Sequence, residues 1–215
     1  MSGYAVKESF LTLQGEGAQA GRRAVFLRFA GCNLWSGREV DRARAECTFC
    51  DTDFVGTSGD GGGRFADAET LADRARALWD AGISGEGGQP YVVLTGGEPA
   101  LQVDAMLLAA LRARGFTIAI ETNGTLPVPQ GVDWICVSPK AGTDVVQRHG
   151  DELKVVYPQA GLDMTEMADW SFAYRLVQPL DTIDGRDTAS ACIAFVLAHP
   201  QWRLSLQTHK LLGLR

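Results

Sequence analysis

The chain has 215 residues, of which 46% are hydrophobic and 21% charged, as in ordinary globular proteins and unlike disordered or fibrous chains. This length suffices for one domain with a sizeable core. The net charge of −6 argues against a general nucleic-acid binder, which normally carries a basic face. No apolar run approaches the ~20 residues of a membrane span, and the first residues resemble no signal segment. With an odd number of five cysteines, we expect a cytoplasmic protein with reduced thiols and no membrane contact.

Strand and helix patterns alternate along the chain. Strands are predicted at residues 4–10, 24–29, 91–94, 116–120, 134–137, 153–157, 174–177 and 202–206. Helices are predicted at residues 65–82, 104–114 and 188–199, with a short helix near Thr165 and a flexible glycine-rich connector at residues 58–63. This rhythm predicts a mostly parallel sheet with right-handed crossovers. Because fewer than eight units are present, we expect an α/β fold of the incomplete TIM-barrel type, forming one catalytic domain over residues 1–215.

Polar residues gather directly after the predicted strands. They stand at the carboxyl edge of a parallel sheet, where α/β folds keep their sites. Arg28 lies inside a short apolar strand, so its guanidinium must pair with an anion or end in a polar cavity. Its planar fork suits a carboxylate ligand, although an internal ion pair satisfies it equally.

Three cysteines, Cys32, Cys47 and Cys50, follow one another at the spacing C-x14-C-x2-C, within a loop at about residues 30–55. A closed zinc site takes four protein ligands, as does a fully protein-ligated iron-sulfur cluster. Three thiolates leave one position open for a small chelating molecule. The cysteines alone leave the cluster, a zinc site and unrelated buried thiols as alternatives. Cys136 and Cys192 stand in apolar stretches and are predicted to be core thiols.

The stretch Thr95-Gly96-Gly97-Glu98-Pro99 follows an apolar strand. Two consecutive glycines let the backbone approach a ligand closely, and the glutamate provides an acceptor beside it. Taken alone, such a pair is more often a tight turn. Together with the three cysteines it resembles the GGEP motif of radical S-adenosylmethionine enzymes, which holds the amino group of the methionine moiety.

Within that superfamily, further short motifs resemble the 7-carboxy-7-deazaguanine synthases of 7-deazapurine (queuosine) biosynthesis. The motifs are LQGEG near the start, CDT after the third cysteine, LTGGEP, ETNGT, SPK, QP and QTHK. The resemblance covers nearly the whole chain. It implies that the three cysteines hold a 4Fe-4S cluster and that the open iron binds S-adenosylmethionine. The implied enzyme is a carbon-nitrogen lyase that converts 6-carboxy-5,6,7,8-tetrahydropterin to 7-carboxy-7-deazaguanine and releases ammonia.

The resemblance also assigns substrate contacts. Leu13, Gln14 and Gly15 match the pterin-binding turn, and Glu16 faces the guanidine-like edge of the pterin; without the family they are a hairpin turn with a surface glutamate. The remaining matches are Arg28 for the substrate carboxylate, Thr95 for the substrate, Thr52 for Mg2+ and the carboxylate of Arg215 for the pterin. Without the family, Thr52 is a helix cap and the last residues are a frayed tail.

Cofactor contacts are implied along four later strand ends and in the cysteine loop. They are Thr48, Phe49, Gly97, Glu98, Glu121, Asn123, Ser138, Lys140, Gln178, Pro179, Leu180 and Asp181. Lys140 is equally well explained as a solvated loop charge. The chain departs from the superfamily in the spacing of its first two cysteines, which fourteen residues separate in place of three. We interpret these fourteen residues as a cover for the cluster or as a docking site for its electron donor.

Two other functions stay open at this point. The first is an activating enzyme that makes a glycyl radical on a partner protein, which would use the same cofactors but need an open groove for the partner polypeptide. The second is a zinc-stabilised binding module, which would need no iron. For the synthase we expect a flavodoxin-type electron donor and a homodimer that covers the lateral opening of the barrel, with no nucleic acid as partner.

Overall fold

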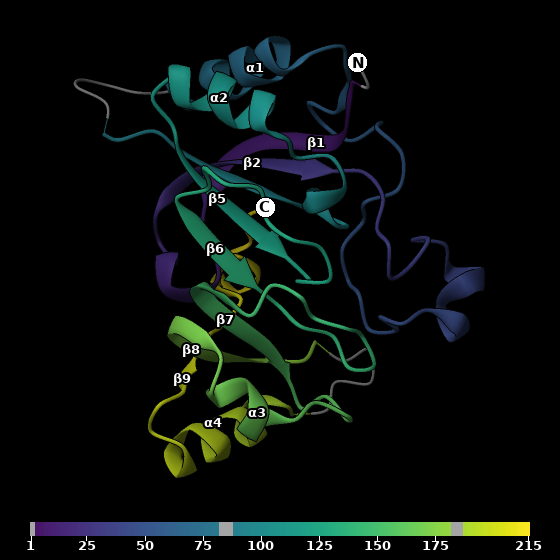
Figure 1. Ribbon diagram of the computed structural model, residues 1–215, viewed down its shortest axis with the longest axis vertical. Coiled ribbons are helices and arrows are strands. Elements are labelled where there is room, and N and C mark those ends of the chain that lie inside the picture. Colours follow the sequence, from purple (N-terminus) through teal and green to yellow (C-terminus); the bar gives the residue numbers. More distant parts are fainter. Residues whose placement is uncertain (1–2, 82–87, 182–186) are drawn as a thin grey trace.

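A computed structural model describes residues 3–81, 88–181 and 187–215, and within these residues nine strands form one sheet (Figure 1). The strands are β1 Tyr4–Leu13, β2 Arg23–Phe29, β3 Gly63–Phe65, β4 Tyr91–Gly96, β5 Thr117–Thr122, β6 Trp134–Val137, β7 His149–Tyr157, β8 Ser171–Pro179 and β9 Arg203–Leu204. The α-helices are α1 Ala68–Asp80, α2 Ala105–Ala113, α3 Met164–Ala168, α4 Ala189–Ala198 and α5 Thr208–Leu212. Short 3-10 helices are η1 Gly17–Gln19, η2 Glu39–Arg44 and η3 Pro99–Leu101.

The sheet is open and mostly parallel. Its order is β3-β1-β2-β4-β5-β6-β7-β8-β9, so β3 and β9 form its two edges. β1 runs antiparallel to both β2 and β3, and every neighbouring pair from β2 to β9 is parallel. The predicted incomplete barrel with a mostly parallel sheet is therefore confirmed.

Helices α1 and α2 begin at aspartate caps. The side chain of Asp67 accepts a hydrogen bond from the backbone N–H of Thr70 at the start of α1, and Asp104 does the same for Leu107 in α2. Each cap satisfies a backbone donor that the first turn leaves without a partner. Both helices pack through apolar residues against one face of the sheet (Figure 1).

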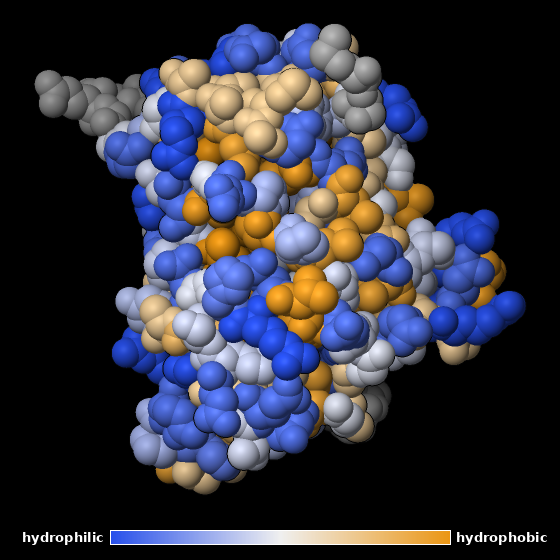
Figure 2. Space-filling model, viewed as in Figure 1, coloured by the Kyte–Doolittle hydropathy of each residue, from blue (hydrophilic) through white to orange (hydrophobic). Residues whose placement is uncertain are grey.

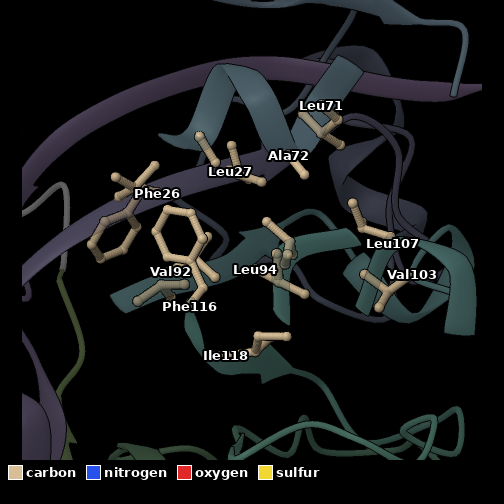
Figure 3. Close-up of a cluster of buried hydrophobic side chains, with 14 of the residues drawn as sticks. Phe26, Leu27, Leu71, Ala72, Val92, Leu94, Val103, Leu107, Phe116 and Ile118 are labelled. Atoms are coloured by element: carbon tan, nitrogen blue, oxygen red, sulfur yellow. The ribbon is translucent and has the colours of Figure 1, made fainter. Parts of the chain in front are cut away.

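The larger hydrophobic core lies between α1, α2 and strands β1, β2, β4 and β5. In Figure 3, Leu71 of α1 and Leu107 of α2 lie near Leu27, Leu94 and the neighbouring strand residues. All four side chains are fully buried. A second core cluster packs β6, β7 and β8 against α3 and α4, with Trp170 and Trp202 among its members. Within the described residues, no helix is long and apolar enough to cross a membrane.

The other face of the parallel strands lines a cavity. Along β4, Val92 and Leu94 face the helices while Thr95 reaches the cavity wall, and along β5 Ile118 and Ile120 alternate with Glu121 in the same way. Successive side chains of a strand point to opposite faces. Each parallel strand can therefore supply core residues and cavity residues at once.

Several segments differ from prediction. Strands β1, β7 and β8 are longer than the predicted ranges 4–10, 153–157 and 174–177. The first helix begins at Ala68 and not at Phe65, because Phe65 belongs to β3 and pairs with Tyr4, and Asp67 caps the helix; its predicted end, Gly82, lies outside the described residues. The predicted connector at 58–63 is bound to β1 through backbone bonds such as Ser9 N–H to the oxygen of Asp60. The last strand, predicted over residues 202–206, is only Arg203–Leu204, and the unpredicted helix α5 follows it.

Candidate active site

A cavity of about 400 Å3 opens at the carboxyl ends of the parallel strands. Its wall combines the cysteine loop, the β1–η1 turn, the ends of β2 and of β4 to β8, and the last nine residues of the chain. Almost all predicted site residues lie on this wall. They are Leu13, Gln14, Gly15, Glu16, Arg28, Cys32, Cys47, Phe49, Cys50, Thr52, Thr95, Gly97, Glu121, Asn123, Ser138, Lys140, Gln178, Pro179, Leu180, Asp181 and Arg215.

Two predicted cofactor contacts, Thr48 and Glu98, do not lie on the cavity wall. Thr48 is exposed, and its carbonyl accepts a hydrogen bond from Arg42. Glu98 is fully buried, and its carboxylate accepts hydrogen bonds from Ala100 N–H, Thr122 Oγ1 and Asn123 N–H. Its side chain therefore joins the ends of β4 and β5 and is already satisfied by the protein.

The glycine pair at the end of β4 is needed for packing against the cysteine loop. A side chain at Gly97 would clash with the backbone oxygen of Gly31 and with the Cβ atom of Cys32. Gly96 has a φ of 140°, which non-glycine residues rarely adopt. The glycines therefore let β4 lie directly beside the first cysteine.

The three loop cysteines are free thiols on one side of the cavity. The backbone N–H of Leu34 lies 3.4 Å from the sulfur of Cys32. A hydrogen bond between the other two thiols raises the pKa of Cys47 and lowers the pKa of Cys50 to about 6. Lys140, whose Nζ donates to the carbonyl and hydroxyl oxygens of Ser138, supplies a positive charge beside them.

These thiols fit a cluster better than a single ion. Within the described ranges, no three His, Cys, Asp or Glu side chains lie close enough together to hold one metal ion. A tetrahedral zinc site needs its ligands around one centre, whereas a 4Fe-4S cluster takes each thiolate on a different iron. The three cysteines would therefore hold the cluster, and the predicted zinc-stabilised module is not favoured.

A buried ion pair forms the floor of the cavity. Lys154 of β7 donates to Glu16 at 2.6 Å and lies 3.8 Å from Glu121 of β5. Burial alone would raise the pKa of Glu16, but the charge of Lys154 and hydrogen bonds from Lys154 and Gln207 lower it to about 2. Gln14 donates to Glu121 at 2.9 Å. The floor thus presents fixed carboxylate and amide groups to a ligand with several N–H donors.

Arg28 of β2 also lines the cavity. Its Nε donates to Glu8 at 2.8 Å, and Glu8 also receives Arg215 at 2.8 Å. No hydrogen bond involves the two Nη atoms of Arg28 within the part of the chain that the structure describes. The internal ion pair, one of the two predicted roles, is present, and Arg28 also lines the cavity. Its role as a carboxylate binder stays a prediction.

Four of the last nine residues, Gln207, His209, Lys210 and Arg215, line the cavity, and of these only Arg215 was predicted as a site residue. Gln207 donates to Glu16, and Thr208 donates to the carbonyl of Gly15 through both its N–H and its hydroxyl. Lys210 bridges Asp51 at 2.7 Å and Asp181 at 2.6 Å. The guanidinium of Arg215 pairs with Glu8 and Asp60, and its backbone oxygen accepts a hydrogen bond from Thr12. The predicted alternative of a frayed tail is therefore wrong.

Cys136 was misread, and Glu152, a buried acid beside it, was missed. Cys136 is buried as predicted, yet it lies on the cavity wall 3.4 Å from Glu152, whereas Cys192 is a core thiol away from it. Burial raises the pKa of Glu152, which accepts a hydrogen bond from Ala18 N–H. The spacing of Glu152 and Lys154, two residues apart on one strand, is the signal that could have placed both on the same face. Thr52 is followed by no helix, so its predicted alternative as a helix cap is wrong.

Comparison with known proteins defines the class of enzyme. The model of the Radical SAM superfamily matches residues 41–154, about half of the chain, and an open parallel sheet carrying three free thiols at its carboxyl edge agrees with it. The chain aligns over 96% of its length with the crystal structure of QueE from Escherichia coli, of which it covers 95%, at a TM-score of 0.67 and 26% identity.

Curated relatives identify the family within this class of enzymes. The chain is 59% identical over 211 residues to a 7-carboxy-7-deazaguanine synthase of Bordetella pertussis, covering 98% of this chain and 99% of the relative. It is equally similar, with the same coverage, to a 7-carboxy-7-deazaguanine synthase of Caulobacter vibrioides. The chain therefore belongs to the 7-carboxy-7-deazaguanine synthase family of radical S-adenosylmethionine enzymes.

Proposed function

We propose that this protein converts 6-carboxy-5,6,7,8-tetrahydropterin to 7-carboxy-7-deazaguanine with release of ammonia, in 7-deazapurine (queuosine) biosynthesis. The observation that carries the proposal is one cavity shared by the three cysteines, the Glu16–Lys154 floor and Arg28. When bound, the cluster and S-adenosylmethionine supply the carbon radical that removes a hydrogen atom from the substrate. The protein's own residues bind and orient the substrate and shield it from water.

The cavity offers complementary groups for each end of such a substrate. The pyrimidinone edge of a pterin carries neighbouring N–H donors, which suit the carboxylate of Glu16 or Glu121 and the amide oxygen of a side chain such as Gln14. The carboxylate at the other end suits the two Nη atoms of Arg28. We propose that S-adenosylmethionine is held by the positions at later strand ends that match the cofactor contacts of the family. They include Asn123, Ser138 and the stretch 178–181.

Anaerobic turnover tests the function. Iron-reconstituted protein would be incubated with reductant, S-adenosylmethionine, Mg2+ and the carboxytetrahydropterin, and products would be identified by mass spectrometry. We expect a product lighter than the substrate by one ammonia. Slow formation of 5′-deoxyadenosine with an unchanged pterin would leave the radical chemistry standing and overturn the substrate, in favour of a glycyl-radical activating enzyme.

Arg28 is expected to determine substrate affinity without affecting the cluster. Arg28→Ala should retain the iron and sulfide content of the wild type and raise KM for the pterin about 10- to 150-fold, the equivalent of ~1.5–3 kcal/mol for a charged hydrogen bond. Arg28→Lys should recover only part of the affinity, because lysine lacks the planar fork. Substrate affinity that is unchanged in Arg28→Ala would remove Arg28 from the binding site.

We also propose that Thr52 binds Mg2+ together with substrate oxygens and water, as Mg2+ prefers oxygen ligands and retains several waters. Support comes from its position on the cavity wall, two residues after Cys50. Thr52→Ala should raise the Mg2+ concentration needed for half-maximal turnover and leave the cluster spectrum unchanged. Thr48→Ala is the matched control in the same loop, since Thr48 is exposed away from the cavity. Equal Mg2+ dependence in both variants would refute the assignment.

The family also suggests a domain organisation, a cellular location, an electron donor and an oligomeric state for this protein. We propose that residues 1–215 act as one catalytic domain with residues 30–55 as its cluster loop, in the cytoplasm, where a flavodoxin-type protein supplies electrons. A homodimer is supported by α4, which is apolar except for Ser190 and nevertheless exposes Ile193 and Leu197, the latter at 80%. Light scattering of the purified protein should give twice the chain mass, and a monomer would refute the dimer.

A further inference from the structure

The fourteen residues between Cys32 and Cys47, here called the insertion, project from the body of the protein as the blue segment at the right of Figure 1. Its middle forms the 3-10 helix η2, and Figure 2 shows mostly hydrophilic side chains on this projection. Val40 at its tip is 80% exposed. Among the charged side chains of the insertion, Arg42 turns back toward the turn between Cys47 and Cys50.

Arg42 makes three kinds of contact. Its Nη1 donates to the carbonyl oxygens of Thr48 at 2.9 Å and of Cys50 at 3.1 Å. Its Nε donates to the carboxylate of Glu39 at 2.8 Å. The guanidinium lies 4.1 Å from the centre of the Trp35 ring, which is itself only 8% exposed. Arg42 is thus held in place on two sides, by a carboxylate and by an aromatic face.

The carbonyl groups that Arg42 binds belong to the short turn that carries Cys47 and Cys50. The Thr48–Phe49 peptide is trans, so its N–H points away from the carbonyl oxygen that Arg42 holds. Holding the carbonyl oxygens of Thr48 and Cys50 from outside therefore also fixes the direction of the N–H groups of these peptides, on the side away from Arg42.

We propose that Arg42 is a positioning residue for the cluster, which fixes the turn between Cys47 and Cys50 and the direction of its peptide N–H groups, and thereby raises the reduction potential of the cluster. Hydrogen bonds to cluster sulfurs and nearby positive charge both favour the reduced state, because reduction adds negative charge. This inference rests on the cluster of the proposed function. It also gives the insertion a function inside its own chain: a brace on the short turn between two cluster ligands.

The test is a reductive titration of the reconstituted cluster, monitored by electron paramagnetic resonance, with neither S-adenosylmethionine nor pterin present. We expect Arg42→Ala to shift the midpoint potential to more negative values and to shorten the lifetime of the cluster in air. Arg42→Lys keeps the charge but loses the geometry of the fork, so its potential should fall between the two. Arg44→Ala, an exposed arginine of the same 3-10 helix, should match the wild type.

Two outcomes would overturn the proposal. An unchanged potential in Arg42→Ala would exclude any effect on the cluster, and an Arg42→Lys potential equal to the wild type would assign the effect to charge alone. If Arg42→Ala assembles no cluster, the Lys variant still gives the comparison. A wild-type protein that assembles no cluster would instead refute the proposed function, and a cluster without pterin turnover would leave this inference intact.

Discussion

Cys47→Ala should abolish assembly of the cluster and all radical chemistry. Cys47 is buried and is a proposed ligand, within the turn that Arg42 contacts, and removing one of three thiolates would leave too few to hold the cluster. Iron and acid-labile sulfide after anaerobic reconstitution, together with 5′-deoxyadenosine formation, measure the effect. The expected loss is complete, because no step of the proposed reaction proceeds without the cofactor.

Cys192→Ala is the matched control for this experiment. Cys192 is fully buried in the second core cluster, away from the cavity, so its loss should cost about 1 kcal/mol of stability and leave the cluster intact. Full iron content in Cys47→Ala would show that Cys47 is not a ligand. Cys136, the fourth thiol on the cavity wall, would then be the next residue to test.

Lys154→Met should destabilise the protein by about 3–5 kcal/mol. Lys154 is 5% exposed and pairs with Glu16 and Glu121, so its removal leaves two largely buried carboxylates with amide hydrogen bonds but without this cation. Denaturant unfolding of the apoprotein measures the loss, and Glu16→Gln in the same chain should restore part of it. Substrate affinity should fall as well, because the floor of the cavity would lose its fixed geometry.

Lys210→Met is the control that shows whether the destabilisation in Lys154→Met comes from the burial of that lysine or from the loss of an ion-paired lysine in general. Lys210 also bridges two carboxylates, but its side chain is 40% exposed, so solvent and salt screen both interactions. We expect a loss of at most about 1 kcal/mol. Comparable losses in the two variants would contradict a special role of burial at Lys154.

Much of this architecture follows from local patterns in the sequence. The alternation of strands and helices predicted the open parallel sheet, and the polar residues after each strand predicted the edge at which the cavity opens. The spacing of Cys32, Cys47 and Cys50 indicated three ligands on one loop. These signals are local, because each depends on the periodicity of side chains along one strand or helix or on the spacing of a few neighbouring residues.

Contacts between distant segments could not be predicted in the same way. Lys210 reaches Asp51 across 159 positions of the sequence, and no periodicity relates the two. Glu98 follows a strand like the residues that do line the cavity, but its side chain turns inward to cap η3 and bind β5. The direction of a side chain in a loop depends on the surrounding packing, which composition does not reveal. Arg42 was missed for the same reason, as one of several charges in an exposed segment.

The two edges of the sheet bear on how the protein behaves at high concentration. β3 has three residues and β9 has two, whereas β1 and β8 inside the sheet have ten and nine. A strand exposes its unpaired N–H and carbonyl groups along its full length, so such short edges offer little template for the addition of another chain. Copies of this protein should therefore resist aggregation by sheet extension, and any stable association should occur through side-chain packing, which leaves the sheet content unchanged.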